Sequence, residues 1–135
     1  MISVVRIRSD ILVVLREEAS KQPAQECCGL LAGRDEIIAR AFPATNALAS
    51  ATAYEITPEG LFRLMREIRV AGLQMLGIYH SHPNGDNSPS PADIARAFYP
   101  DAAYFIVSPL PDAARTIRAF SIRDARVTEL EIQAI

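Results

Sequence analysis

The segment spanning residues 76–82 limits the possible folds of this chain more than any other feature. Its first four residues are almost all apolar, which is typical of a strand that is buried on both faces. The two histidines of the protein follow, His80 and His82, and residues two apart on a strand point to the same face. Buried imidazoles need polar partners, and a shared metal ion would satisfy both. The alternative, two histidines on a solvent-facing surface, fits poorly with the apolar run before them.

Length and composition are those of one globular domain. The 135 residues, half of them apolar, are enough for one hydrophobic core, so we expect a single domain over residues 1–135. The 14 Lys and Arg residues and 16 Asp and Glu residues form no run of like charge, so we expect no nucleic acid and no membrane as partner. No apolar stretch approaches the roughly 18 residues of a membrane span or resembles the core of a secretory signal. Cys27 and Cys28 are adjacent and unsuited to a mutual disulfide, which favours a soluble cytoplasmic protein.

Apolar periodicity and turn residues predict an α/β or α+β chain. Thr57 and Pro58 are the residue types of an N-cap and a first helical position, and Gly72 is suited to follow a helix end. Helices are expected over residues 9–21, 57–71 and 90–98. Strands are expected over residues 4–8, 27–32, 36–42, 54–56, 76–82, 104–107, 116–122 and 127–132, with residues 33–35 turning the second and third into a hairpin.

A third metal ligand is needed beside the histidines, because a catalytic zinc site takes three protein ligands and leaves the fourth position to water. Asp86 is the next acid, but it lies in a flexible-looking loop. Asp93 is better placed, as the third residue of a helix that Ser90 begins. Ser90 and Asp93 also form a good helix-capping sequence that needs no metal, and taken alone the pair is better explained that way.

The spacing of these residues resembles a known motif. His80, Ser81 and His82, followed after seven residues by Ser90 and after two more by Asp93, give H-x-H-x7-S-x2-D. This is similar to the JAMM motif of the metal-containing MPN (Mov34/MPN/PAD-1) family of zinc isopeptidases. That family also requires an upstream glutamate, which Glu26 supplies just before the apolar segment at residues 27–32. The resemblance is greatest to short bacterial members that process ubiquitin-like sulfur-carrier proteins.

The resemblance implies a fold and a role for each motif residue. The fold would be a curved mixed β-sheet flanked by helices, similar to the cytidine deaminase arrangement. His80, His82 and Asp93 would bind Zn²⁺, which lowers the pKa of a bound water to about 7. Glu26 would act as general acid/base, and Ser90 would donate a hydrogen bond to the oxyanion of the transition state.

The function that follows is a zinc-dependent metallopeptidase or isopeptidase. It would hydrolyse the bond after the Gly-Gly tail of a ubiquitin-like or sulfur-carrier protein. One alternative is a catalytically silent MPN-type protein-interaction module. Another is a purely structural zinc site with Cys28 as fourth ligand, because Cys28 shares the face of Glu26 if that segment is extended. A buried structural thiol is the favoured interpretation of Cys28. The sequence predicts neither the oligomeric state nor the physiological substrate.

Overall fold

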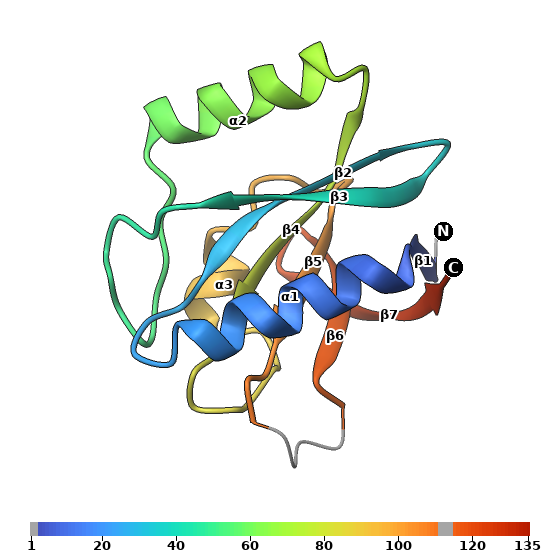
Figure 1. Ribbon diagram of the computed structural model, residues 1–135. Coiled ribbons are helices and arrows are strands. Elements are labelled where there is room, and N and C mark those ends of the chain that lie inside the picture. The colour runs from blue at the N-terminus through green and yellow to red at the C-terminus, as the bar shows by residue number, and fades with distance from the viewer. Residues whose placement is uncertain (1–2, 111–114) are drawn as a thin grey trace.

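The computed structural model describes residues 3–110 and 115–135, and its strands and helices alternate in part along the chain (Figure 1). The elements are β1 (Val4–Ile7), α1 (Ser9–Lys21), β2 (Cys28–Arg34), β3 (Ile37–Ala44), α2 (Pro58–Val70), β4 (Gln74–Ser81), α3 (Pro91–Ala95), β5 (Ala103–Val107), β6 (Ile117–Arg123) and β7 (Arg126–Ala134). Each expected helix is present, and so is each expected strand except the one at residues 54–56. In the described part of the chain, no helix is both long and apolar enough to cross a membrane.

The strands form one mixed sheet in the order β1-β3-β2-β4-β5-β6-β7. β1 is parallel to β3 and β7, β4 is parallel to β5, and the other neighbours are antiparallel. The expected mixed sheet with flanking helices is confirmed, but the expected curved sheet is corrected to a closed barrel. The cause is the four-residue strand β1, which pairs with β7 along its whole length and with β3 at Arg6 and Ile7, so that it joins the two edges.

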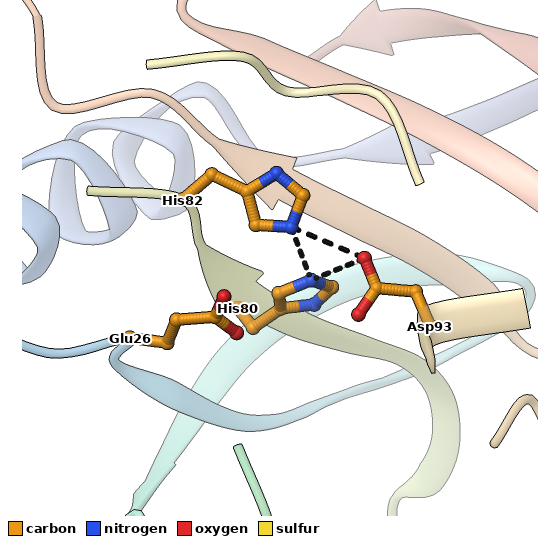
Figure 2. Close-up of side chains that lie close together, drawn as sticks. All are labelled: Glu26, His80, His82 and Asp93. Carbon is orange, nitrogen blue, oxygen red and sulfur yellow. Dashed lines mark hydrogen bonds and ion pairs between the residues drawn. The ribbon is translucent and has the colours of Figure 1, made fainter. Parts of the chain in front are cut away.

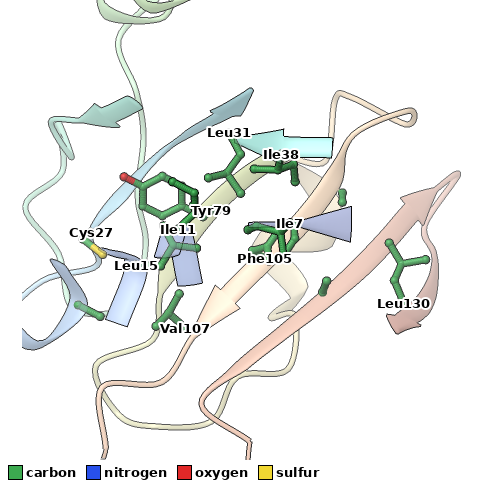
Figure 3. Packing of buried hydrophobic residues seen from close by; sticks show 13 residues of the cluster. Ile7, Ile11, Leu15, Cys27, Leu31, Ile38, Tyr79, Phe105, Val107 and Leu130 are labelled. Carbon is green, nitrogen blue, oxygen red and sulfur yellow. The ribbon is translucent and has the colours of Figure 1, made fainter. Parts of the chain in front are cut away.

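Two hydrophobic clusters pack against opposite faces of the sheet. The face of α1 that contains Ile11 and Leu15 packs with Tyr79 and Phe105 in one cluster (Figure 3). α2 contributes Leu64 and Ile68 to the other cluster, which lies against the opposite faces of β4 and β5. Since consecutive residues of β4 enter different clusters, the expectation of a strand buried on both faces is confirmed.

Three local expectations need correction. Residues 54–56 belong to the loop between β3 and α2 and lie outside the sheet, because no strand pairs with them. The helix that follows Ser90 ends at Ala95, before residue 98, because Arg96, with φ −103° and ψ 15°, leaves the helical conformation as the C-cap. The Tyr99 N–H then donates to the Tyr104 hydroxyl at 3.0 Å. β4 ends at residue 81, one residue before His82, although the His82 N–H continues the ladder by donating to the carbonyl of Val107.

The packing of α1 gives a test of the core. Leu15 is fully buried and Val14, its neighbour on the same helix, is 41% exposed. We expect Leu15→Ala to lower the free energy of unfolding by about 2–5 kcal/mol, because it removes apolar contacts and leaves a cavity. Val14→Ala should change it by about 0.5 kcal/mol or less. Urea denaturation of both variants measures this difference, and equal losses would contradict the assigned packing of α1.

Candidate metal centre

Four ionisable side chains from three parts of the chain meet at the carboxyl end of β4. Glu26 precedes β2, His80 lies on β4, His82 follows it, and Asp93 lies on α3 (Figure 2). One nitrogen or oxygen atom from each lies within 4.8 Å of the corresponding atoms of the other three. The structure therefore brings together Glu26 and the three residues that the motif gave as metal ligands.

Three of these groups form a compact triangle of potential ligand atoms. The Nε2 atoms of His80 and His82 are 3.0 Å apart. Asp93 Oδ2 lies 3.1 Å from each of them. A tetrahedral zinc ion with bonds of about 2.0–2.1 Å keeps its ligand atoms about 3.3 Å apart. Two imidazole nitrogens and one carboxylate oxygen at this spacing fit such an ion with only a small outward movement.

The hydrogen bonds around the triangle leave the ligand atoms facing inward. His82 Nδ1 donates to the carbonyl of Asp86, so in the neutral imidazole Nε2 keeps its lone pair. Among the described residues, Glu26 Oε1 and His80 Nδ1 are buried polar atoms without a hydrogen-bond partner. Buried polar atoms are nearly always paired in folded proteins. The unpaired Glu26 oxygen indicates that this site takes a further group from solution.

Burial and neighbouring charges set the protonation of the four groups. Burial raises the pKa of Glu26 to about 7, with a further increase from the Asp93 charge and an opposing effect of His82. Burial also acts to raise the pKa of Asp93, but hydrogen bonds from His80 and His82 bring it well below its usual range. Burial lowers the pKa of His80. The site therefore contains an ionised Asp93, a neutral His80, and a Glu26 that exchanges its proton near neutral pH.

Asp93 is oriented by a capping box at the start of α3. Ser90 Oγ accepts from the N–H of Asp93 at 3.0 Å, and Asp93 Oδ2 accepts from the N–H of Ser90 at 2.9 Å. The two interpretations of this pair therefore do not compete, because the capping bond also directs Asp93 Oδ2 toward the histidines. The Ser90 hydroxyl uses a lone pair for the cap, and its hydrogen remains available for donation.

The structure also shows two contacts at the site that the sequence did not predict. Ser81 connects the histidine segment to the residue after Glu26: its Oγ accepts from the Cys27 N–H at 2.9 Å, and its own N–H donates to the Cys27 carbonyl at 3.0 Å. The ring of Tyr54 stacks on His80, with centroids 4.6 Å apart. The position of Ser81 between two histidines was an available signal, whereas nothing in the sequence near Tyr54 pointed to this contact.

A mostly apolar cavity of about 480 Å³ adjoins the triangle. Asp93, one of the four ionisable residues, lines it, and so does Tyr54, whose ring stacks on His80. Leu61 of α2, Tyr104 of β5 and Phe98, which is 73% exposed, form other parts of its wall. An extended peptide segment could therefore place apolar side chains directly beside the ligand triangle.

Comparison with known proteins identifies the class. Residues 8–123 match the family described as prokaryotic homologs of the JAB domain, and because this span is most of the chain, the chain belongs to that family. The resemblance inferred from the H-x-H-x7-S-x2-D motif is confirmed by this match. A JAB1/MPN domain protein of known crystal structure from Archaeoglobus fulgidus has the same fold, with a TM-score of 0.63, 19% identity and 96% of each chain covered.

Two relatives with named activities are similar to this chain. A desampylase from Haloferax volcanii is 40% identical over 105 residues, which cover 76% of each protein. The CysO-cysteine peptidase of Mycobacterium tuberculosis is 31% identical over 131 residues, which cover 96% of this chain and 90% of that protein. The predicted enzyme class agrees with these names.

Cys28 lies opposite His80 in the β2–β4 pairing, but its sulfur is not part of the group of potential ligand atoms that Glu26, His80, His82 and Asp93 form. Its thiol is buried, contacts the carbonyl of Ala44 at 3.9 Å, and has a pKa that burial raises to about 12. This environment, a buried thiol beside a main-chain carbonyl, is typical of a structural cysteine. The expectation that Cys28 is buried is confirmed.

Cys28→Ser distinguishes an open site from one closed by a fourth protein ligand. We expect the variant to bind as much zinc as the wild type, about one ion per chain, because the thiol lies outside the ligand group. Elemental analysis after chelator-free purification measures the ratio. A variant that folds but has lost its zinc would mean that Cys28 is a ligand and that the site is structural.

Proposed function

We propose that this chain is a zinc-dependent peptidase that hydrolyses the bond after the Gly-Gly tail of a ubiquitin-like carrier protein. The observation that carries the proposal is the triangle of His80, His82 and Asp93 with the unpaired, buried carboxyl of Glu26 beside it. A structural zinc site is normally closed by four protein ligands, whereas these three leave one position for water or substrate. The names of the relatives support peptidase chemistry.

The proposed ligands are His80, His82 and Asp93. When bound, zinc supplies a Lewis acid that polarises the scissile carbonyl and makes water nucleophilic near neutral pH. The three side chains fix the position of that acid: Asp93 through its capping bond to Ser90, and His82 through its bond to the Asp86 carbonyl. Burial acts to lower the pKa of His82, but its bonds to Asp93 and to the Asp86 carbonyl raise it, so a metal ion that binds His82 should displace a proton.

Glu26 is the proposed general acid/base. Its carboxyl lies beside the ligand triangle without being needed to complete it, and burial keeps its pKa near 7. A carboxyl with such a pKa can accept a proton from water and then deliver it to the leaving amine. Its burial, at 2% exposure, excludes solvent that would otherwise compete for that proton.

Ser90 is proposed to stabilise the oxyanion of the tetrahedral transition state. Its Oγ is fixed by the N–H of Asp93, and its hydroxyl hydrogen is left free to donate. A donor fixed in advance costs little reorganisation when negative charge develops on the substrate oxygen. The cap and the catalytic role therefore use different parts of the same hydroxyl group.

The proposed docking site for the substrate tail is the loop segment at residues 53–56, which we call the docking segment. The main chain of Glu55 forms hydrogen bonds on one side of this segment. Its N–H donates to Asn46 Oδ1 at 3.2 Å, and its carbonyl accepts from the Ala47 N–H at 2.8 Å. Among the described residues, the main-chain groups of Tyr54 and Ile56 have no hydrogen-bond partner, and both residues line the cavity. An extended tail could pair with these groups as an added strand. Its two glycines would then pass the metal centre, and side chains that precede them would enter the cavity.

Paired variants of the site test the proposal. His82→Ala should lose zinc and cleavage together, because it removes a ligand. Glu26→Gln should keep about one zinc per chain but cleave about 10²–10⁴-fold more slowly, because it removes only proton transfer. Zinc content and cleavage of a Gly-Gly-tailed carrier conjugate are measured on the same preparations. Normal cleavage by Glu26→Gln would refute its role, and a wild-type protein that binds no added zinc would instead be an interaction module.

The substrate tail gives a second test. Replacing Gly-Gly by Val-Val should lower kcat/KM at least about 100-fold, because branched side chains displace the scissile bond from its position beside the triangle. A carrier with a substitution on its folded body, away from the tail, serves as the control and should be cleaved normally. Unchanged cleavage of the Val-Val tail would exclude the proposed docking mode.

A further inference from the structure

The main-chain N–H and carbonyl of Glu26 bond to a loop and not to a strand of the sheet. β2 begins only at Cys28, two residues further on. The N–H of Glu26 donates to the carbonyl of Ser50 at 2.8 Å, and the carbonyl of Glu26 accepts from Asn46 Nδ2 at 3.0 Å. Both partners belong to the loop between β3 and α2. The position of the proposed general base therefore depends on how this loop is folded.

The side-chain amide of Asn46 organises this loop. Asn46 is 7% exposed, and its Nδ2 donates to the carbonyls of Glu26 and Ala53, each at 3.0 Å. Its Oδ1 accepts from the N–H groups of Leu48 and Glu55, at 3.0 and 3.2 Å. An asparagine amide has two N–H donors and two acceptor lone pairs, so all four are used. Two of these bonds end on the docking segment and one ends on Glu26.

We infer that Asn46 is a positioning residue that fixes Glu26 and the docking segment relative to each other. The inference rests on the proposed function and adds to it a residue that contacts neither metal nor substrate. Tyr54, in the middle of the docking segment, stacks on His80, so the same loop also lies against the ligand triangle. One buried amide thus connects the main chain of the proposed base to the main chain that would receive the substrate.

This arrangement couples binding to chemistry. A tail that pairs with Tyr54 and Ile56 orders the free side of the docking segment, while Asn46 bonds its other side to Glu26. Binding energy from the tail can therefore be used to hold the base in its productive position. A displacement of about 1 Å at a catalytic group can cost roughly 100-fold in rate, so loss of this connection should be visible in kcat.

A double-mutant cycle with Glu26→Gln separates positioning from a general effect on folding. Asn46→Asp keeps an oxygen acceptor but removes both Nδ2 donations, and Asn46→Ser removes the amide without adding charge. In the Glu26 background we expect both to lower kcat about 10–100-fold and to raise KM, with about one zinc per chain retained. In the Glu26→Gln background the same changes should lower kcat less than about threefold, because the group that they position is no longer functional.

Single-turnover cleavage of the Gly-Gly-tailed conjugate, zinc content and thermal melting are measured for each variant. Thr45→Ala, an exposed change in the same loop at a side chain without a hydrogen bond to the described residues, is the matched control and should behave as the wild type. Equal losses of kcat in the two backgrounds would overturn the inference, as would failure of both Asn46 variants to fold. A wild type that binds zinc but does not cleave the conjugate would contradict the proposed function. An active wild type in which the effects of the Asn46 and Glu26 substitutions on kcat simply multiply would contradict only the role of Asn46.

Discussion

The pairing of β2 with β4 is the constraint on which the metal centre depends. It sets Cys28 opposite His80, and the bonds between Ser81, the last residue of β4, and Cys27, the residue before β2, continue the same register. Because side chains alternate along a strand, a slip of one residue would move His80 to the face of β4 that packs on α1. Both faces of β4 have buried side chains, so such a slip is costly. It would remove the apolar side chains of β4 from the clusters in which they pack and would place polar groups there.

The site brings ionisable groups together in a region with little solvent, where a charged side chain is costly to bury. The structure compensates for this cost to different degrees at Asp93 and at Glu26. Asp93 Oδ2 accepts from the Ser90 N–H and lies 3.1 Å from the Nε2 atom of each histidine, so its charge is well stabilised. Glu26 receives none at Oε1 from the described residues, and its pKa is raised accordingly. Such unevenness is expected where function requires one carboxylate to remain an anion and another to exchange its proton.

Much of the scaffold could be predicted from the sequence, because it depends on local patterns of neighbouring residues. The apolar run before His80, the cap at Thr57 and the cap at Ser90 each depend on neighbouring residues, and the structure shows all three. The motif also named four residues that the structure brings together. Closure of the sheet could not be predicted, because it depends on a four-residue strand that pairs with two partners far away in sequence. The strand expected at residues 54–56 failed for the same reason, since a strand requires a partner that a local pattern does not specify.

The two faces of β4 have different roles, one in stability and the other in the chemistry of the site. On the α1 side, Tyr79 donates to Glu18 at 2.7 Å and packs so closely on β2 that a Cβ on Gly29 would lie 2.5 Å from its hydroxyl. On the other side, the ring of Tyr54 stacks on His80, and His80 Nε2 forms one corner of the ligand triangle. The tightly packed face of β4 on the α1 side holds the histidine ligands in position before a metal ion binds, as a metal centre requires. The loop that contains Asn46 has no such support from the sheet. Changes in that loop can therefore alter substrate recognition while the ligand geometry, which depends on β4 and α3, stays the same.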